Sequence, residues 1–245
     1  MSSWLPPAAS AHAGEIDLVL NVVHVFMLVL FVGWSAYFGW VLIRFRRGRQ
    51  PKADHAGATG RFATGTEIGV VVVEAVLLVG LALPVWFSRT ASMPTDETAV
   101  AVRVVAEQFA WHMHYPGADG EFGRTSIDLV SDTNPVGLDR SSPNGADDLM
   151  VPGQLHLPVD RPVVIQLSSK DVVHSFGVAA MRIKQDAIPG LLSPVWFTPT
   201  VEGEYEIVCS QLCGLGHYRM KGIITVESAE AFADFLARET QLQVR

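Results

Sequence analysis

The hydrophobic pattern of the chain begins with two long apolar runs. Residues 18–43 are 26 consecutive residues without a formal charge. A helix of that length would span about 39 Å, more than the roughly 30 Å hydrocarbon core of a bilayer. A second run, residues 68–88, contains a single charged residue, Glu74. One such run could be the core helix of a soluble protein, but two in succession predict a transmembrane hairpin.

Beyond Pro94 the pattern changes to short runs of valine and isoleucine bounded by turn residues. Such runs predict β-strands, here over residues 100–105, 162–167, 203–208 and 222–226. Residues 132–148 are rich in Asn, Pro, Ser and Gly and predict a long polar surface loop. Ser228 can cap a short helix that runs to Leu236. The pattern therefore indicates a membrane anchor over residues 1–92 and a Greek-key sandwich or barrel over residues 93–245.

Charge is distributed unevenly between these two parts. The whole chain has 18 Lys+Arg and 25 Asp+Glu, a net charge of −7. Residues 1–92 carry a net charge of +2, whereas residues 93–245 carry −9. An acidic domain lacks the basic face that neutralises phosphates, so we expect no nucleic-acid partner. Long-range attraction favours a cationic protein partner instead.

Basic residues gather between the two apolar runs and set the expected orientation. They are Arg44, Arg46, Arg47, Arg49, Lys52 and Arg61. Residues 1–17 contain no Lys or Arg. The positive-inside rule therefore predicts that the connecting loop is cytoplasmic and that both termini lie outside. The acidic domain would then be on the extracytoplasmic, periplasmic side of a bacterial-type plasma membrane.

Both cysteines of the chain fall in one phrase, Cys-Ser-Gln-Leu-Cys-Gly-Leu-Gly-His-Tyr-Arg-Met, at residues 209–220. This phrase offers two thiolates, an imidazole and a thioether: Cys209, Cys213, His217 and Met220. Soft sulfur combined with imidazole suits copper in electron-transfer sites. A second imidazole is available from His174, which follows the predicted strand 162–167.

Three other uses of these residues are compatible with their spacing. A Cys209–Cys213 disulfide would suit an oxidising compartment. A zinc site with Cys₂His₂ ligands would leave Met220 without a role. A mononuclear blue-copper site needs one cysteine, so the second would be idle. The residue types alone leave these possibilities open beside a dinuclear copper site.

The same phrase resembles the binuclear CuA loop of cytochrome c oxidase subunit II. Three further segments are similar to motifs of that family, in the family's order: 108–111 (QFAW), 169–176 (SKDVVHSF) and 184–190 (KQDAIPG). With the two-helix anchor, the resemblance covers nearly the whole chain. It implies a two-helix transmembrane hairpin followed by an all-β, cupredoxin-like Greek-key domain.

The resemblance also implies a CuA centre with two copper ions. Cys209 and Cys213 would bridge the ions, and His174 and His217 would each bind one. Met220 would be a weak ligand, and Gln211 would offer its backbone carbonyl. The chain would therefore relay electrons and hold no catalytic residue for the oxygen chemistry.

The implied function is that of the electron-accepting subunit of a respiratory cytochrome-c oxidase. Cytochrome c, or another cationic donor, would reduce the copper centre. Electrons would then pass to the haem-copper subunit I, where reduction of oxygen to water is coupled to proton translocation. Subunit III and the membrane are the other implied partners.

Two departures from the family pattern limit which functional roles of the family can be assigned to residues of this chain. Gln211 stands where most members have Glu, whose carboxylate also reaches a magnesium ion at the interface with subunit I. A neutral amide is a poorer ligand for a hard cation, so the resemblance does not establish a magnesium site here. Phe109 replaces the tryptophan at which electrons enter in the family. We expect Phe109 to be the docking contact and Trp111 to pack beneath it.

Four other residues have both a functional and a structural interpretation. Glu67 resembles the family's carboxylate at the entrance of a proton channel, but an acid at a helix N-terminus is also favoured by the helix dipole. Glu74 lies within an apolar run and should face a partner chain. His112 and His114 alternate in a strand-like segment, and His114 stands where many members carry an acid. We expect both to be exposed or partly packed on one face.

Other functions share parts of this pattern. A CuA-bearing subunit of a nitric oxide reductase would carry the same ligands, because the partner chain decides the reaction. A Sco-like copper chaperone has a similar cysteine pair, but its histidine lies far downstream in a thioredoxin-like fold. A copper-free quinol oxidase subunit II is excluded because the ligand set is intact.

Overall fold

The computed structural model describes residues 4–49, 52, 55, 60–91, 93–95 and 99–243. The chain divides into a helical unit, Gly14–Ser92, and a β unit that combines Met93–Arg245 with Met1–Ala13. The expected boundary between residues 92 and 93 falls beside Ser92, which lies outside the described residues.

The segment before the first helix differs from the expected anchor. Ala9 is buried, its amide donates to the carbonyl of Ala180 and its carbonyl accepts from the amide of Thr200. Ser10 forms an isolated bridge with Pro199. These residues are polar or small and their backbone groups need partners, which the β unit supplies.

Two long apolar helices form the other unit. The first is α1 (Ala13–Arg44). The second runs from Arg61 to Thr90 as α2 (Arg61–Leu77), a π-helical turn (Leu78–Ala82) and α3 (Leu83–Thr90). Both are long and apolar enough to cross a membrane, with mean hydropathies of 2.3 and 2.6. They contain the predicted runs 18–43 and 68–88. The π turn precedes Pro84, which cannot donate a backbone hydrogen bond to the preceding turn.

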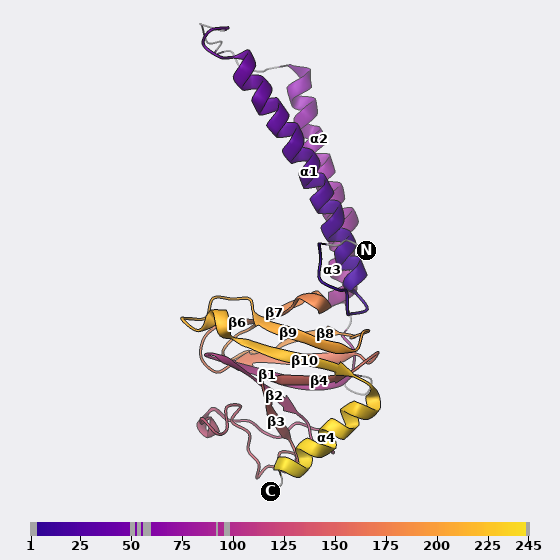
Figure 1. The fold of residues 1–245 in the computed structure, drawn as a ribbon, viewed down its shortest axis with the longest axis vertical. Helices are drawn as coiled ribbons and strands as arrows, with labels where there is room; N and C mark the ends of the chain where they lie inside the picture. The colour runs from indigo at the N-terminus through magenta and orange to yellow at the C-terminus, as the bar shows by residue number, and fades with distance from the viewer. Residues whose placement is uncertain are drawn as a thin grey trace. The chain divides into compact units, whose positions relative to one another are not determined.

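The β unit is a sandwich of two five-stranded sheets (Figure 1). The first sheet has the order β3 (Leu149–Pro152), β2 (Ala110–Tyr115), β1 (Val100–Glu107), β5 (Val163–Ser169) and β8 (Ser193–Phe197). The second has the order β4 (Gln154–Pro158), β10 (Lys221–Glu227), β9 (Gly203–Cys209), β6 (His174–Val178) and β7 (Ile183–Ala187). All four predicted strands are present. The cupredoxin-like, Greek-key expectation is confirmed.

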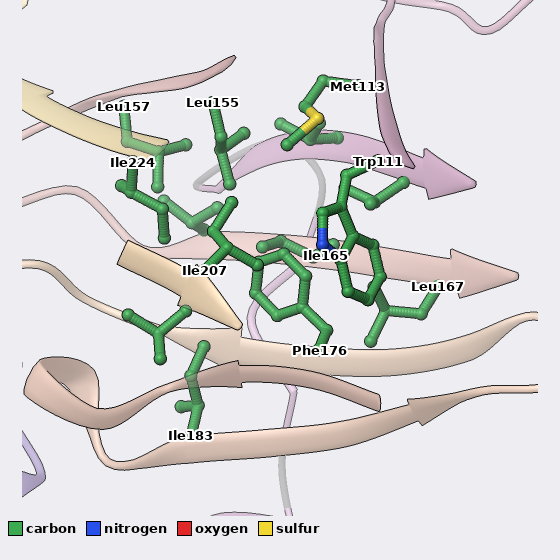
Figure 2. Close-up of a cluster of buried hydrophobic side chains, with 14 of the residues drawn as sticks. Trp111, Met113, Leu155, Leu157, Ile165, Leu167, Phe176, Ile183, Ile207 and Ile224 are labelled. Carbon is green, nitrogen blue, oxygen red and sulfur yellow. The ribbon is translucent and has the colours of Figure 1, made fainter. Parts of the chain in front are cut away.

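Alternation along the strands separates the core from the two outer faces. Val104 pairs with Leu167 on the inner face of the first sheet, whereas Arg103 pairs with Gln166 on its outer face. Side chains from both sheets meet in the core, including Trp111 and Phe176 (Figure 2). Their rings lie 5.5 Å apart in an edge-to-face arrangement. Burying each such side chain contributes about 1.5–3 kcal/mol, so this core holds the sheets together firmly.

The polar loop and the C-terminal helix complete the β unit. No strand forms in residues 132–148, as predicted. The helix α4 (Ala229–Gln243) begins as predicted, with the Ser228 hydroxyl accepting a hydrogen bond from the amide of Ala231. It continues beyond Leu236 because the Gln243 amide pairs with both backbone groups of Met150.

Candidate copper centre

The pairing of β6 with β9 brings the distant histidine to the cysteines. Phe176 of β6 is registered with Cys209, the last residue of β9. His174, at the start of β6, is therefore placed beside the loop that follows β9. His217 lies in a 3₁₀ turn (His217–Arg219) at the end of that loop, and Met220 follows it.

Six donor atoms from these segments converge. The Sγ atom of Cys209 lies 3.9 Å from Nδ1 of His174 and 3.1 Å from the carbonyl oxygen of Gln211. The Sγ atom of Cys213 lies 3.7 Å from Nδ1 of His217 and 3.8 Å from Sδ of Met220. The two sulfurs are 3.7 Å apart. Each cysteine thus has its own imidazole, and the thioether stands beside the second cysteine.

The separation of the two cysteine sulfurs fits a metal site better than a disulfide. Both are unpaired thiols, and their sulfur separation far exceeds the roughly 2.05 Å of a disulfide bond. Burial, together with the neighbouring Cys209, raises the pKa of the Cys213 thiol to about 11. Binding of a metal ion to Cys213 would release the proton of this thiol.

Close packing of this loop against the β1–β2 turn requires its glycines. Gly214 has φ +134°, and a side chain there would come within 2.7 Å of the Gln108 amide nitrogen. A Cβ at Gly216 would lie 2.4 Å from the ring of Phe109. The glycines therefore allow Phe109 to lie directly on the candidate copper loop.

A polar network that we did not predict links the turn to both ligand segments. Oδ1 of Asp171 lies 2.8 Å from Nε2 of His174, and Oδ2 accepts a 2.7 Å hydrogen bond from the amide of Gln108. The side-chain amide of Gln108 donates to the carbonyl of Cys213 at 2.6 Å. Burial alone would raise the pKa of Asp171, but these hydrogen bonds and one from Val172 hold it below its ordinary value. Asp171 and Gln108 both lie in segments that resemble family motifs, and this resemblance was the sequence signal that could have identified them.

Phe109 and Trp111 lie in different environments. Phe109 is half-buried in the turn between β1 and β2, with the Arg219 guanidinium 5.9 Å from its ring centre. Trp111 is fully buried, and its ring centre lies 6.2 Å from that of His174. The structure thus places Trp111 in the core beside a candidate ligand, while Phe109 keeps part of its ring at the surface.

Three exposed apolar side chains surround the ligands, and the sequence interpretation missed them. Leu212, Leu215 and Tyr218 are 77%, 97% and 86% exposed. They lie in the same short loop as the buried donors Cys213 and Met220. The loop therefore buries its sulfur atoms and presents apolar groups outward. Gln211 is also exposed, with only its carbonyl oxygen directed at Cys209.

The two carboxylates of the second helix lie on one face of α2. Glu67 and Glu74 are seven residues, or two turns, apart, and both are exposed in this chain. The helix dipole acts mainly on charges in the first turn of a helix. Because α2 begins at Arg61, Glu67 lies beyond that first turn. The dipole explanation for Glu67 therefore loses support.

The expectation for the two strand histidines is wrong for His114. His112 is partly buried, with Nε2 2.8 Å from Oε1 of Glu107. His114 is only 1% exposed, and its Nε2 lies 2.5 Å from the fully buried Asp148. Alternation placed both on one face, but the polar loop before β3 folds back over His114. Asp148 also accepts hydrogen bonds from the amides of Gly117 and Gly123, which anchors that loop.

Several known proteins are similar to this chain. A family model described as "Cytochrome C oxidase subunit II, periplasmic domain" matches residues 100–228. The alternative cytochrome c oxidase subunit 2 of Bradyrhizobium diazoefficiens is 32% identical over 241 residues, covering 96% of this chain and 84% of that protein. The cytochrome c oxidase subunit 2 of Cereibacter sphaeroides is 30% identical over 245 residues, covering 94% and 78%.

Among solved structures, the periplasmic domain of subunit II of the Bradyrhizobium japonicum cytochrome oxidase is similar, with a TM-score of 0.46 and 25% identity. The similarity covers 62% of this chain and 99% of that one. The family model and the relatives span the β unit and, in the longer alignments, the helices as well. This chain belongs to the cytochrome c oxidase subunit II family.

Proposed function

We propose that this chain carries a binuclear CuA centre that accepts electrons from cytochrome c and passes them to a haem-copper subunit I. The observation that carries the proposal is the pair of buried sulfurs 3.7 Å apart, each facing its own histidine nitrogen. Oxygen would be reduced to water on the partner subunit, with coupled proton translocation.

The donor set fits two copper ions better than the alternatives. Cys209 and Cys213 lie between His174 on one side and His217 on the other, an arrangement suited to two shared thiolates. A structural zinc site uses four ligands in a tetrahedron, which would leave the Met220 sulfur and the Gln211 carbonyl without a purpose. The β-sandwich also differs from the thioredoxin-like fold of the copper chaperone alternative, which argues against that alternative.

The residues of this chain supply rigidity and exclude water around the centre. Bound copper would supply a one-electron couple shared through the two thiolates. Cys209, Cys213, Met220 and His174 are buried, so solvent has little to reorganise when the charge changes. The hydrogen bond between His174 Nε2 and Asp171 fixes the ring and leaves Nδ1 directed at Cys209.

The membrane topology completes the proposal. The basic residues between α1 and α2 favour a cytoplasmic loop, and the termini and β unit would then be periplasmic. Subunit I, subunit III and a cationic donor are the proposed partners. Glu67 would admit protons from the cytoplasmic side, and Glu74 would lie against another chain.

Metal analysis of the purified oxidase, combined with copper-loop variants, tests the centre. We expect two CuA coppers for each copy of this chain and a mixed-valence spectrum. Cys209→Ser should abolish that spectrum, whereas Met220→Leu should mainly shift the reduction potential, as expected for a weak axial ligand. Tyr218→Phe, in the same loop but exposed, is the matched control and should change neither.

The result can also contradict the proposal. One copper per chain, or stoichiometric zinc from cells supplied with both metals, would disprove the binuclear centre. The intact complex could instead consume nitric oxide in preference to oxygen. That result would keep the copper centre but assign the chain to a nitric oxide reductase.

A further inference from the structure

A cavity of about 370 Å³ lies on the outer face of the first sheet, apart from the candidate copper ligands. Its floor is formed by β1 and β5, where Arg103 is registered with Gln166 and Val105 with Ser168. Its walls come from residues 125–136, which lead into the polar loop, and from residues 190–192 before β8. A cavity of this size with mostly apolar walls and a few polar groups is typical of small-ligand sites.

The charge of this cavity is opposite to that of the surrounding domain. No Asp or Glu is among the described residues that line it, although residues 93–245 carry a net charge of −9. Its titratable lining residues are all basic: Arg103, His114 and Lys170. Lys170 is already paired, because its Nζ lies 2.6 Å from Oε2 of Glu107. Arg103, which also lines a neighbouring cavity together with Glu121, is therefore the lining cation left without an ion pair among the described residues.

Arg103 is partly desolvated and forms no ion pair with any residue that the structure describes. Its Nε donates to Oε1 of Gln166 at 3.1 Å, and its guanidinium carbon lies 4.1 Å from the ring centre of Phe122. Burial lowers the pKa of Arg103, with a smaller opposing effect from Asp148. Asp148 itself is occupied by His114 and by the amides of Gly117 and Gly123. A guanidinium held this way has two Nη groups to offer to a carboxylate.

His114 provides a second polar atom at the same cavity. Its Nε2 is held by Asp148, and its Nδ1 is buried without a hydrogen-bond partner among the described residues. Leaving a buried polar atom unpaired costs about 1–3 kcal/mol. His114 also lines the cavity, so its ring forms part of the surface that a ligand would contact.

We propose that this cavity binds a small organic anion, with its carboxylate on Arg103 and its apolar body against the walls. Val105 of the floor and Val130, Pro135 and Leu192 of the walls supply the apolar surface. Ser168 lies in the floor between the basic and apolar groups. The cationic end selects the charge of the ligand, and the apolar walls select an organic anion over an inorganic one.

The test uses the full chain in lipid nanodiscs with benzoate as the probe and benzamide as its neutral isostere. Saturation-transfer NMR titrations should show saturable benzoate binding and at least tenfold weaker binding of benzamide. Arg103→Gln should weaken benzoate binding at least tenfold, because a charge-assisted pair is lost. Lys221→Gln, which removes an exposed cation from the other sheet, is the matched control and should leave the affinity unchanged.

Two further measurements keep the proposal falsifiable if Arg103→Gln perturbs folding. Ser168→Met fills the floor without changing charge and should abolish benzoate binding while the thermal unfolding midpoint stays within a few degrees. Inorganic phosphate should compete at least tenfold less well than benzoate. Equal binding of benzoate and benzamide, unchanged affinity in Ser168→Met, or phosphate as strong as benzoate would overturn the proposal.

Discussion

Asp171 holds two parts of the site with one carboxylate. One oxygen fixes the ring of His174, and the other accepts the amide of Gln108, whose side chain reaches Cys213. A carboxylate that orients a ligand histidine raises its basicity and sets its tautomer. The short side chains of Asp171 and Gln108 thus connect residues that are far apart in the sequence.

Replacing Asp171 with Asn should weaken copper binding about 10- to 100-fold, because the amide cannot accept on both sides and no longer polarises His174. Competition with a copper chelator measures the affinity, and electron paramagnetic resonance reports the altered histidine coupling. Asp128→Asn, which changes an exposed acid in the 3₁₀ turn Ile127–Leu129, is the control. Wild-type affinity and spectrum in Asp171→Asn would show that the network is incidental.

At the scale of elements, we expect the turn between β1 and β2 to determine what the proposed donor contacts. The turn places Phe109 on the loop glycines and keeps part of its ring exposed, whereas Trp111 of β2 is fully buried. Leu215 and Tyr218 extend this apolar surface across the copper loop. We therefore expect a docking contact made by the turn and the loop together.

Phe109→Ala should lower the bimolecular rate of reduction by cytochrome c about tenfold, because an apolar contact near the centre is removed. Trp111→Phe should change that rate less, since residue 111 lies below the surface. Stopped-flow reduction at several donor concentrations separates docking from electron transfer. A large loss in Trp111→Phe with none in Phe109→Ala would reverse the assignment.

The second helix carries the other element-scale prediction. Glu67→Gln should slow steady-state oxygen consumption several-fold while leaving the reduction of the copper centre by cytochrome c unchanged, because only proton uptake is affected. Glu15→Gln, an acid in the first turn of α1, serves as the control. Wild-type turnover in Glu67→Gln would return this residue to a purely structural role.

For the whole molecule, we expect the charge asymmetry to govern association with the proposed donor. The net charge of −9 over residues 93–245 should attract a cationic cytochrome over distances longer than contact. Salt screens such attraction over about 8 Å at physiological ionic strength.

Raising the ionic strength from about 10 to 200 mM should therefore slow the bimolecular reduction by cytochrome c about tenfold or more. Reduction by a small neutral reductant is the control and should be nearly insensitive to salt. A cytochrome reaction that is equally insensitive would remove the electrostatic part of the proposal.

The sequence by itself determined the features that depend on local pattern. The lengths of the apolar runs predicted both long helices, since a bilayer-spanning helix needs little besides some twenty apolar residues. Alternation and turn residues predicted β1, β5, β9 and β10. Five of the six candidate donor residues lie within residues 209–220, because a loop after one strand can present them together. The predictions of the helices and strands succeeded because the interactions involved are local.

Only the tertiary structure decided which distant residues meet and which face is covered. His174 is 35 residues from Cys209, and the β6–β9 pairing brings their side chains within 3.9 Å. His114 alternates like an exposed residue, yet the loop anchored by Asp148 buries it. The link from Asp171 through Gln108 to Cys213 and the cavity beside Arg103 arise in the same way. Pairing register and loop folding are set by the packing of the whole sandwich, which no local pattern contains.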